Sequence, residues 1–134
     1  MALKLKLKPH EKLIIDGAVI RNGGSRCELF IENNVPLLRE KDIIGVNEAD
    51  SPCKKVYFVI QMMYVDEKNI AQHHKTYWGL VRDIIEAAPS TKLMFQVISN
   101  HILRDNFYLA LKAAQKLIEY EQEVMNRVRT ASGL

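Results

Sequence analysis

The residues with the clearest chemical potential are lysines that alternate with leucines at the start of the chain. Residues 3–8 read Leu-Lys-Leu-Lys-Leu-Lys, and Pro9 ends the run. Because successive side chains along a strand point to opposite faces, the run predicts a strand with one apolar and one cationic face. A row of lysines either protects a strand edge from unwanted pairing or binds phosphates, and the sequence leaves both interpretations open.

Positive charge is concentrated in the first 26 residues of the chain. That segment holds six cations and two acids, whereas residues 27–50 hold two cations and six acids. The net charge of the 134-residue chain is only +3, which by itself implies no polyanionic partner. The local excess is what a surface for single-stranded nucleic acid requires. The candidate RNA contacts are Lys4, Lys6, Lys8, Lys12, Arg21 and Arg26.

Residue patterns typical of catalysis or metal binding are scarce. The sequence has no glycine-rich nucleotide loop, metalloprotease or serine-hydrolase motif. His73 and His74 are adjacent, and adjacent helical residues point about 100° apart, so they would chelate a metal poorly. Cys27 alternates with Leu29 and Ile31, as a small core residue would. We expect a protein that is not an enzyme, with no catalytic residues, no metal and no cofactor.

The first third of the chain has the two-residue period of β-strands. Asp16-Gly17 and Asn22-Gly23-Gly24 are turn sequences, and we expect positive φ angles at the second turn as well as at the first. Pro36 cannot donate a ladder hydrogen bond, so the last strand should lie at an edge. Phe30 is expected to pack under the helical lobe, because neighbouring glutamates would repel phosphate. The expected strands cover residues 3–8, 11–15, 18–21, 26–32 and 35–38.

From residue 50 onward the spacing of apolar residues becomes helical. Ser51-Pro52 is typical of a helix start, a second helix should begin at Asp66-Glu67 and end at Pro89, and a fourth should begin near Asp105. Ser90 is expected to cap the third helix, whose buried face would hold Leu93, Met94, Val97, Ile98 and Ile102.

The predicted fold class is therefore α+β. A small antiparallel β-sheet or barrel over residues 1–46 should precede a four-helix lobe over residues 51–129, with a flexible tail at 130–134. No signal peptide fits the N-terminus, no apolar run reaches membrane length, and the two cysteines match no disulfide framework. We expect a cytoplasmic protein with reduced thiols that does not bind membranes.

Aromatic and methionine side chains in the helical half suggest a second class of function, a protein-interaction module. Such side chains can form an adaptable apolar surface, although the simpler interpretation is that they fill the core. The candidate protein-interaction residues are Tyr57, Met62, Met63, Tyr64 and Met94.

Read as a whole, the sequence resembles the FlbT family of flagellin regulators of alphaproteobacteria. The resemblance lies in Met1–Ile15, Gly17–Ile20, Ile31-Glu32-Asn33 with Val35-Pro36, Leu38-Arg39-Glu40, and the last helix from Ala110 to Glu121. It implies an RNA-binding repressor that binds the 5′ untranslated region of flagellin mRNA, lowers translation and promotes mRNA degradation during flagellum biogenesis. A second small regulator, FlaF, would be a partner.

The N-terminal lobe also resembles the small RNA-binding regulator CsrA. The shared pattern is Glu11-x-Leu13-x-Ile15-x-Gly17, a strand from Arg26 to Ile31, then Pro36 and Arg39-Glu40. This resemblance implies RNA contacts at Lys4, Lys6 and Arg39, and it makes a homodimer compatible with the sequence. Lysines replace the arginines of that family's first strand, and a helical lobe is added.

Two hypotheses follow. The first is an mRNA-binding regulator that covers the flagellin leader with its β lobe. The alternative is an adaptor or chaperone whose helical lobe holds flagellin or a FlaF-like regulator. Salt-sensitive binding would favour the first, because phosphate contacts release counterions.

Overall fold

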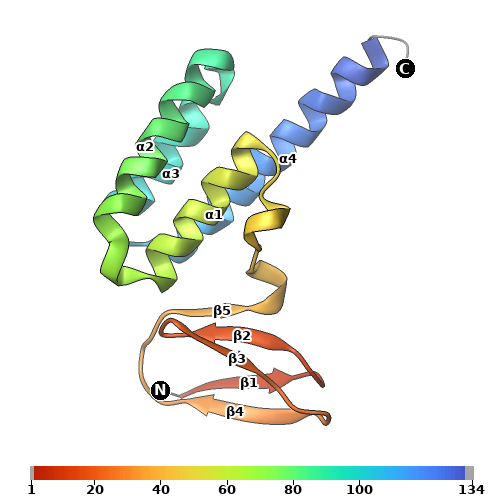
Figure 1. Cartoon of the computed structure of the whole chain (residues 1–134), viewed down its shortest axis with the longest axis vertical. Helices are drawn as coiled ribbons and strands as arrows, with labels where there is room; N and C mark the ends of the chain where they lie inside the picture. Colours follow the sequence, from red (N-terminus) through yellow and green to blue (C-terminus); the bar gives the residue numbers. More distant parts are fainter. Residues whose placement is uncertain (1, 132–134) are drawn as a thin grey trace. The chain divides into compact units, whose positions relative to one another are not determined.

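A computed structural model describes residues 2–131 of the chain, which form two compact units divided between Ile43 and Ile44. We call them the β unit and the helical unit. Figure 1 shows the strands in the first and the four long helices in the second. The α+β class predicted from the sequence is confirmed.

The β unit contains two small antiparallel sheets. One pairs β1 with β4, and the other has the order β3-β2-β5. The strands are β1 (Leu3–Leu7), β2 (Lys12–Ile15), β3 (Ala18–Arg21), β4 (Cys27–Ile31) and β5 (Leu37–Arg39). Their bounds lie close to those expected from the alternation of residue types.

The core of the β unit is formed by leucines from β1 and β2. Leu5, Leu7 and Leu13 are buried, and partly buried side chains from β2, β4 and β5 pack against them. Lys4 and Lys6 are exposed on either side of Leu5, and Leu3, at the start of the strand, is also exposed. The alternation of leucine and lysine therefore does separate a core face from a solvent face, as the two-residue period predicts.

The two predicted turns are built differently. Asp16 (φ 49°) and Gly17 (φ 84°) are both left-handed, which is what a tight two-residue hairpin between β2 and β3 requires. The positive φ expected at Gly23 and Gly24 is wrong, since Gly17 is the only described glycine with that backbone conformation. Hydrogen bonds from the side chain of Asn22 hold the second turn instead.

The four helices are α1 (Pro52–Val65), α2 (Ile70–Ala87), α3 (Lys92–Leu103) and α4 (Phe107–Ala131). Ser51 caps α1 by accepting a hydrogen bond from the Lys54 amide, and Pro52 is its first residue, so this predicted start is confirmed. Ser90 is not a cap. It lies inside the 3₁₀ helix η4 (Pro89–Thr91), and its hydroxyl hydrogen-bonds to that of Tyr120.

The core of the helical unit differs from the prediction mainly in α3. Phe95, Ile98 and Ile102 form its buried face, whereas Leu93 and Val97 are 73% and 51% exposed. The predicted buried face was therefore rotated around the helix and left out Phe95, the largest apolar side chain of α3. At the other end of the unit, α4 continues through Thr130 and Ala131, which were expected to start the tail. Residues 132–134 of that predicted tail lie outside the described residues.

Candidate nucleic-acid interface

The pairing of β1 with β4 determines which side chains share the solvent face of this sheet. Lys4 lies opposite Phe30 and Lys6 lies opposite Glu28. All four side chains are exposed. One step beyond the last pair, Leu7 with Cys27, the chain continues with Lys8 on one side and Arg26 on the other. We call this surface the β1–β4 face: Lys4, Lys6, Lys8, Arg26, Glu28 and Phe30.

Three of the expected cations line one hollow at the end of this face. The hollow has a volume of about 440 Å³ and is lined by Lys6, Lys8 and Arg26 together with Leu7, Cys27 and Glu28. Three cations and one acid leave it with net positive charge, which is the condition for binding phosphate groups. The register of two strands thus brings together residues that are about twenty positions apart in the sequence.

Lys4 lies at the other end of the β1–β4 face. Its ammonium is 3.6 Å from the Glu28 carboxylate, and both side chains are half exposed. An ion pair of this length in water contributes little to stability and is easily exchanged for another partner. Lys4 therefore remains available to an incoming anion.

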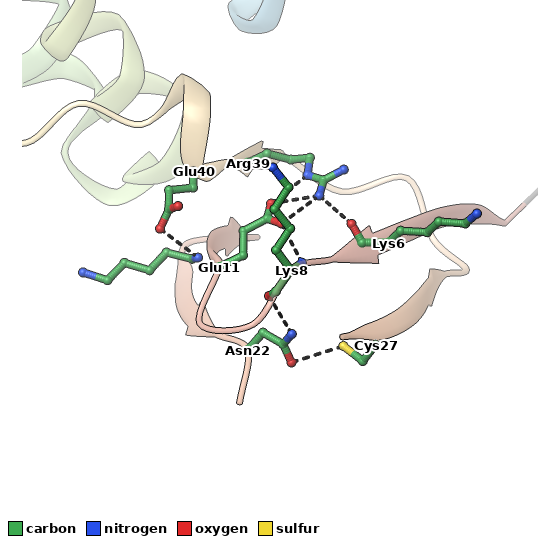
Figure 2. Close-up of polar contacts among 8 residues, drawn as sticks. Lys6, Lys8, Glu11, Asn22, Cys27, Arg39 and Glu40 are labelled. Atoms are coloured by element: carbon green, nitrogen blue, oxygen red, sulfur yellow. Dashed lines mark hydrogen bonds and ion pairs between the residues drawn. The ribbon is translucent and has the colours of Figure 1, made fainter. Parts of the chain in front are cut away.

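Arg39, expected to contact RNA, is instead engaged within the protein. Its Nη2 donates to Glu11 Oε2 at 2.8 Å and to the Lys6 carbonyl at 2.7 Å, and its Nε also donates to Glu11. Figure 2 shows the guanidinium reaching from β5 to this carboxylate, while the Lys6 side chain extends away from the cluster. The charge of Arg39 is balanced by Glu11 and its contacts hold the end of β1, while its contact with RNA stays a prediction.

Glu11 receives two kinds of stabilisation in its ionised form. The backbone amide of Lys8 donates to its Oε1 at 3.0 Å, and Arg39 adds hydrogen bonds and opposite charge. Together these contacts lower the pKa of Glu11 below its ordinary value, against the opposing effect of partial burial.

Lys12 and Arg21 belong to the other sheet of the β unit. They are directly opposite one another on β2 and β3, and both side chains are exposed. Like charges in that arrangement repel, and an anion bound between them would relieve the repulsion. These two cations are adjacent, as the hairpin requires, but they do not lie on the β1–β4 pair.

Asn22 is a residue whose role the sequence did not indicate beyond its place in a turn. Its Nδ2 donates to the carbonyls of Lys8 at 2.8 Å and Ser25 at 3.0 Å, and its Oδ1 accepts from the Cys27 thiol at 3.2 Å. These bonds tie the segment after β1 to the segment before β4 (Figure 2). They fix the backbone of Lys8, which lines the hollow.

Phe30 does not pack away from solvent as expected. Its side chain is 57% exposed, because its phase on β4 is opposite to that of Leu29 and Ile31, which are partly buried against the core. The neighbouring glutamates suggested a buried ring, whereas the alternation of side chains along β4 indicates a ring that points to solvent.

Two of the five predicted protein-interaction residues belong to the helical core. Tyr57 and Met63 are 4% and 1% exposed and form no surface, while Met62, Tyr64 and Met94 are half-buried. The Tyr64 ring lies 6.5 Å from that of Phe107, measured between centroids. A hollow of about 390 Å³ lies elsewhere, with an apolar lining that includes Leu80 and Ile84 of α2 and Val124 and Met125 of α4.

The adjacent histidines of the helical unit show no arrangement for metal binding. His73 pairs with Asp66 at 3.0 Å instead of acting together with His74. Within residues 2–131, no group of three His, Cys, Asp or Glu side chains is arranged to hold a metal ion. Nor does any described helix combine the length and the apolar character that crossing a membrane demands.

The fold and this site define a small α+β protein whose distinctive surface is a cationic strand pair. The family described as "Flagellar protein FlbT" matches residues 3–125, and the chain belongs to the FlbT family. It is 46% identical over 125 residues to "Probable flagellum biosynthesis repressor protein FlbT 1" of Bradyrhizobium diazoefficiens, covering 92% of this chain and 85% of that protein.

Two other relatives have similar names. A Rhodopseudomonas palustris protein, "Probable flagellum biosynthesis repressor protein FlbT", is 39% identical over 95% of this chain and 100% of its own length. The "Flagellum biosynthesis repressor protein FlbT" of Caulobacter vibrioides is 35% identical over 96% of this chain and 92% of its own. The family resemblance stated from the sequence is confirmed. No solved structure matches the chain.

Proposed function

We propose that this chain is a cytoplasmic repressor of flagellum biogenesis that binds the 5′ untranslated region of flagellin mRNA through its β1–β4 face. The names of its relatives support the regulatory part. The observation that carries the RNA-binding part is the hollow in which Lys6, Lys8 and Arg26 meet. A cluster of exposed cations along an extended strand can follow the phosphates of an unpaired RNA segment.

Repression in this proposal requires occupancy of the leader and no chemistry by the protein. A protein seated on the leader blocks ribosome access, and a message that is not translated is exposed to nucleases. The proposed protein partners, a FlaF-like regulator and flagellin, stay predictions, as does the homodimer.

The test is binding of the purified protein to a flagellin leader RNA across a salt series. Three phosphate contacts predict that a fourfold rise in salt weakens binding roughly 20-fold, from a slope of about −0.7 per contact on single strands. The variant Lys6→Ala/Lys8→Ala/Arg26→Ala should flatten that dependence by about two units of slope.

The matched control removes three exposed lysines from the helical unit, Lys68→Ala/Lys75→Ala/Lys92→Ala, with the same change in net charge. It should bind RNA as the parent does. Equal losses of RNA affinity in both variants would mean that binding depends on net charge alone, which would contradict a defined site.

The alternative function is an adaptor that acts through the helical unit, and the same titration separates the two. Partner binding that persists at high salt and is indifferent to the β-unit variant would favour the adaptor. The lysines of β1 would then protect a strand edge.

A further inference from the structure

The β1–β4 face combines an exposed aromatic ring with cations. Phe30 lies directly opposite Lys4 and two residues from Glu28 on β4, with 57% of its side chain exposed. A phosphate site alone has no need of such a ring. Aromatic rings beside a basic groove are the common means by which proteins hold unpaired bases, because each base has a flat π-face.

We propose that Phe30 stacks on an unpaired base of the bound RNA while the hollow holds the phosphates that follow it. This inference rests on the proposed function and adds to it a contact with one base, which must be unpaired and accessible. Arg26 directly precedes β4 and lies four residues from Phe30, about 13 Å in an extended chain. The ring and the hollow thus occupy opposite ends of the face, and a short extended RNA segment spans them.

The acids on this face fit the same arrangement. Glu28 and Glu32 lie two residues before and after Phe30, and both are exposed. Carboxylates repel phosphate, but they accept hydrogen bonds from the amino groups at the edges of bases. Adenine, cytosine and guanine carry an exocyclic amino group, whereas uracil does not. Uracil can donate to a glutamate only through its ring N3–H, so an edge contact with these acids favours a base that carries an amino group over uracil.

The experiment compares short oligoadenylate, oligocytidylate and oligouridylate of equal length, each titrated across the same salt series. Phe30→Ala should weaken binding of the first two roughly 5- to 150-fold, which is the range of stacking on one base, and should leave the salt slope unchanged. Val19→Ala on β3 is the matched control, since it also shortens an exposed apolar side chain of the β unit, and it should have no effect.

Phe30→Trp in a Trp78→Phe background keeps a ring at this position and adds a reporter. Its fluorescence should be quenched on binding, with affinity retained. This variant remains informative even if Phe30→Ala reduces the folded fraction. Glu28→Gln/Glu32→Gln should reduce the preference for adenylate and cytidylate over uridylate, which we expect to be about 10-fold in the parent.

The outcomes distinguish the two proposals. Parent-like affinity in Phe30→Ala, with binding lost in Lys6→Ala/Lys8→Ala/Arg26→Ala, would overturn stacking and leave the proposed function standing. Equal binding of the three oligonucleotides would overturn the role of the glutamates. Failure of the parent protein to bind any RNA would overturn both proposals.

Discussion

Arg39 on β5 forms a two-pronged ion pair with Glu11, in which both carboxylate oxygens accept from the same guanidinium. A further bond from this guanidinium reaches the Lys6 carbonyl. One side chain from the three-stranded sheet therefore holds the end of β1, which belongs to the other sheet. The position of the cationic strand depends on an arginine that the CsrA resemblance assigned to RNA.

Replacement of Arg39 should primarily destabilise the β unit. Arg39→Ala removes several charge-assisted hydrogen bonds and leaves Glu11 without its cation, which should lower the free energy of unfolding by about 2 kcal/mol. Arg39→Lys should recover only part of this, because an ammonium cannot form the two-pronged pair. Urea denaturation followed by circular dichroism measures the change.

Arg82→Ala is the control, because Arg82 is exposed and its ion pair with Asp83 is long, at 3.9 Å. It should change stability by less than about 0.5 kcal/mol. An Arg39→Ala protein of parental stability that has lost RNA affinity would instead make Arg39 a direct contact.

The stability of the β unit should depend on pH through Glu11. Its pKa is lower in the folded protein than its ordinary value of 4.5. The stabilisation is thus fully present above that ordinary value and is lost as the pH falls through the lower, folded pKa. Glu11→Gln should be less stable than the parent protein at neutral pH. Below pH 4.5 its free energy of unfolding should fall less steeply than that of the parent. Acid titrations of both proteins, monitored by thermal unfolding, test this, and parallel curves would contradict it.

Asn22→Ala should loosen the hollow without removing any of its cations. The substitution takes away the bonds to the Lys8 and Ser25 carbonyls and to the Cys27 thiol, so we expect a stability loss of about 1–2 kcal/mol and weaker RNA binding. Asn100→Ala, at an exposed position of α3, is the control. Amide hydrogen exchange at residues 8–11 should increase in Asn22→Ala alone.

The two cysteines should react with thiol reagents at different rates. Burial, with Glu121 nearby, raises the pKa of Cys53 to about 12, and the thiolate is the reactive form. Cys27 is only half-buried. At pH 8 a chromogenic disulfide should modify Cys27 first, and Cys27→Ser should remove the fast phase. A fast phase that persists in Cys27→Ser would contradict the assignment.

Most of the fold could be predicted from local patterns in the sequence. Contacts between residues far apart in the sequence could not. Alternation identified the lysine face, and Ser51-Pro52 marked the start of α1, because both signals lie within a few residues. The Glu11–Arg39 pair joins positions 28 apart, and neither residue type indicates its partner. The prediction for Phe30 was wrong because the strand alternation, and not the charge of the neighbouring glutamates, determines that its ring points outward.

Glu121 of α4 accepts hydrogen bonds from the Ser51 hydroxyl and the Cys53 amide at the start of α1. The first helix is thus completed by a residue about 70 positions later in the chain, whereas the polar contacts described for the β unit all lie within residues 4–40. On a translating ribosome, both partners of each of these contacts in the lysine-bearing unit are present while most of the helical unit is still unsynthesised. The order of synthesis therefore delivers the charged surface first and the helical bundle last.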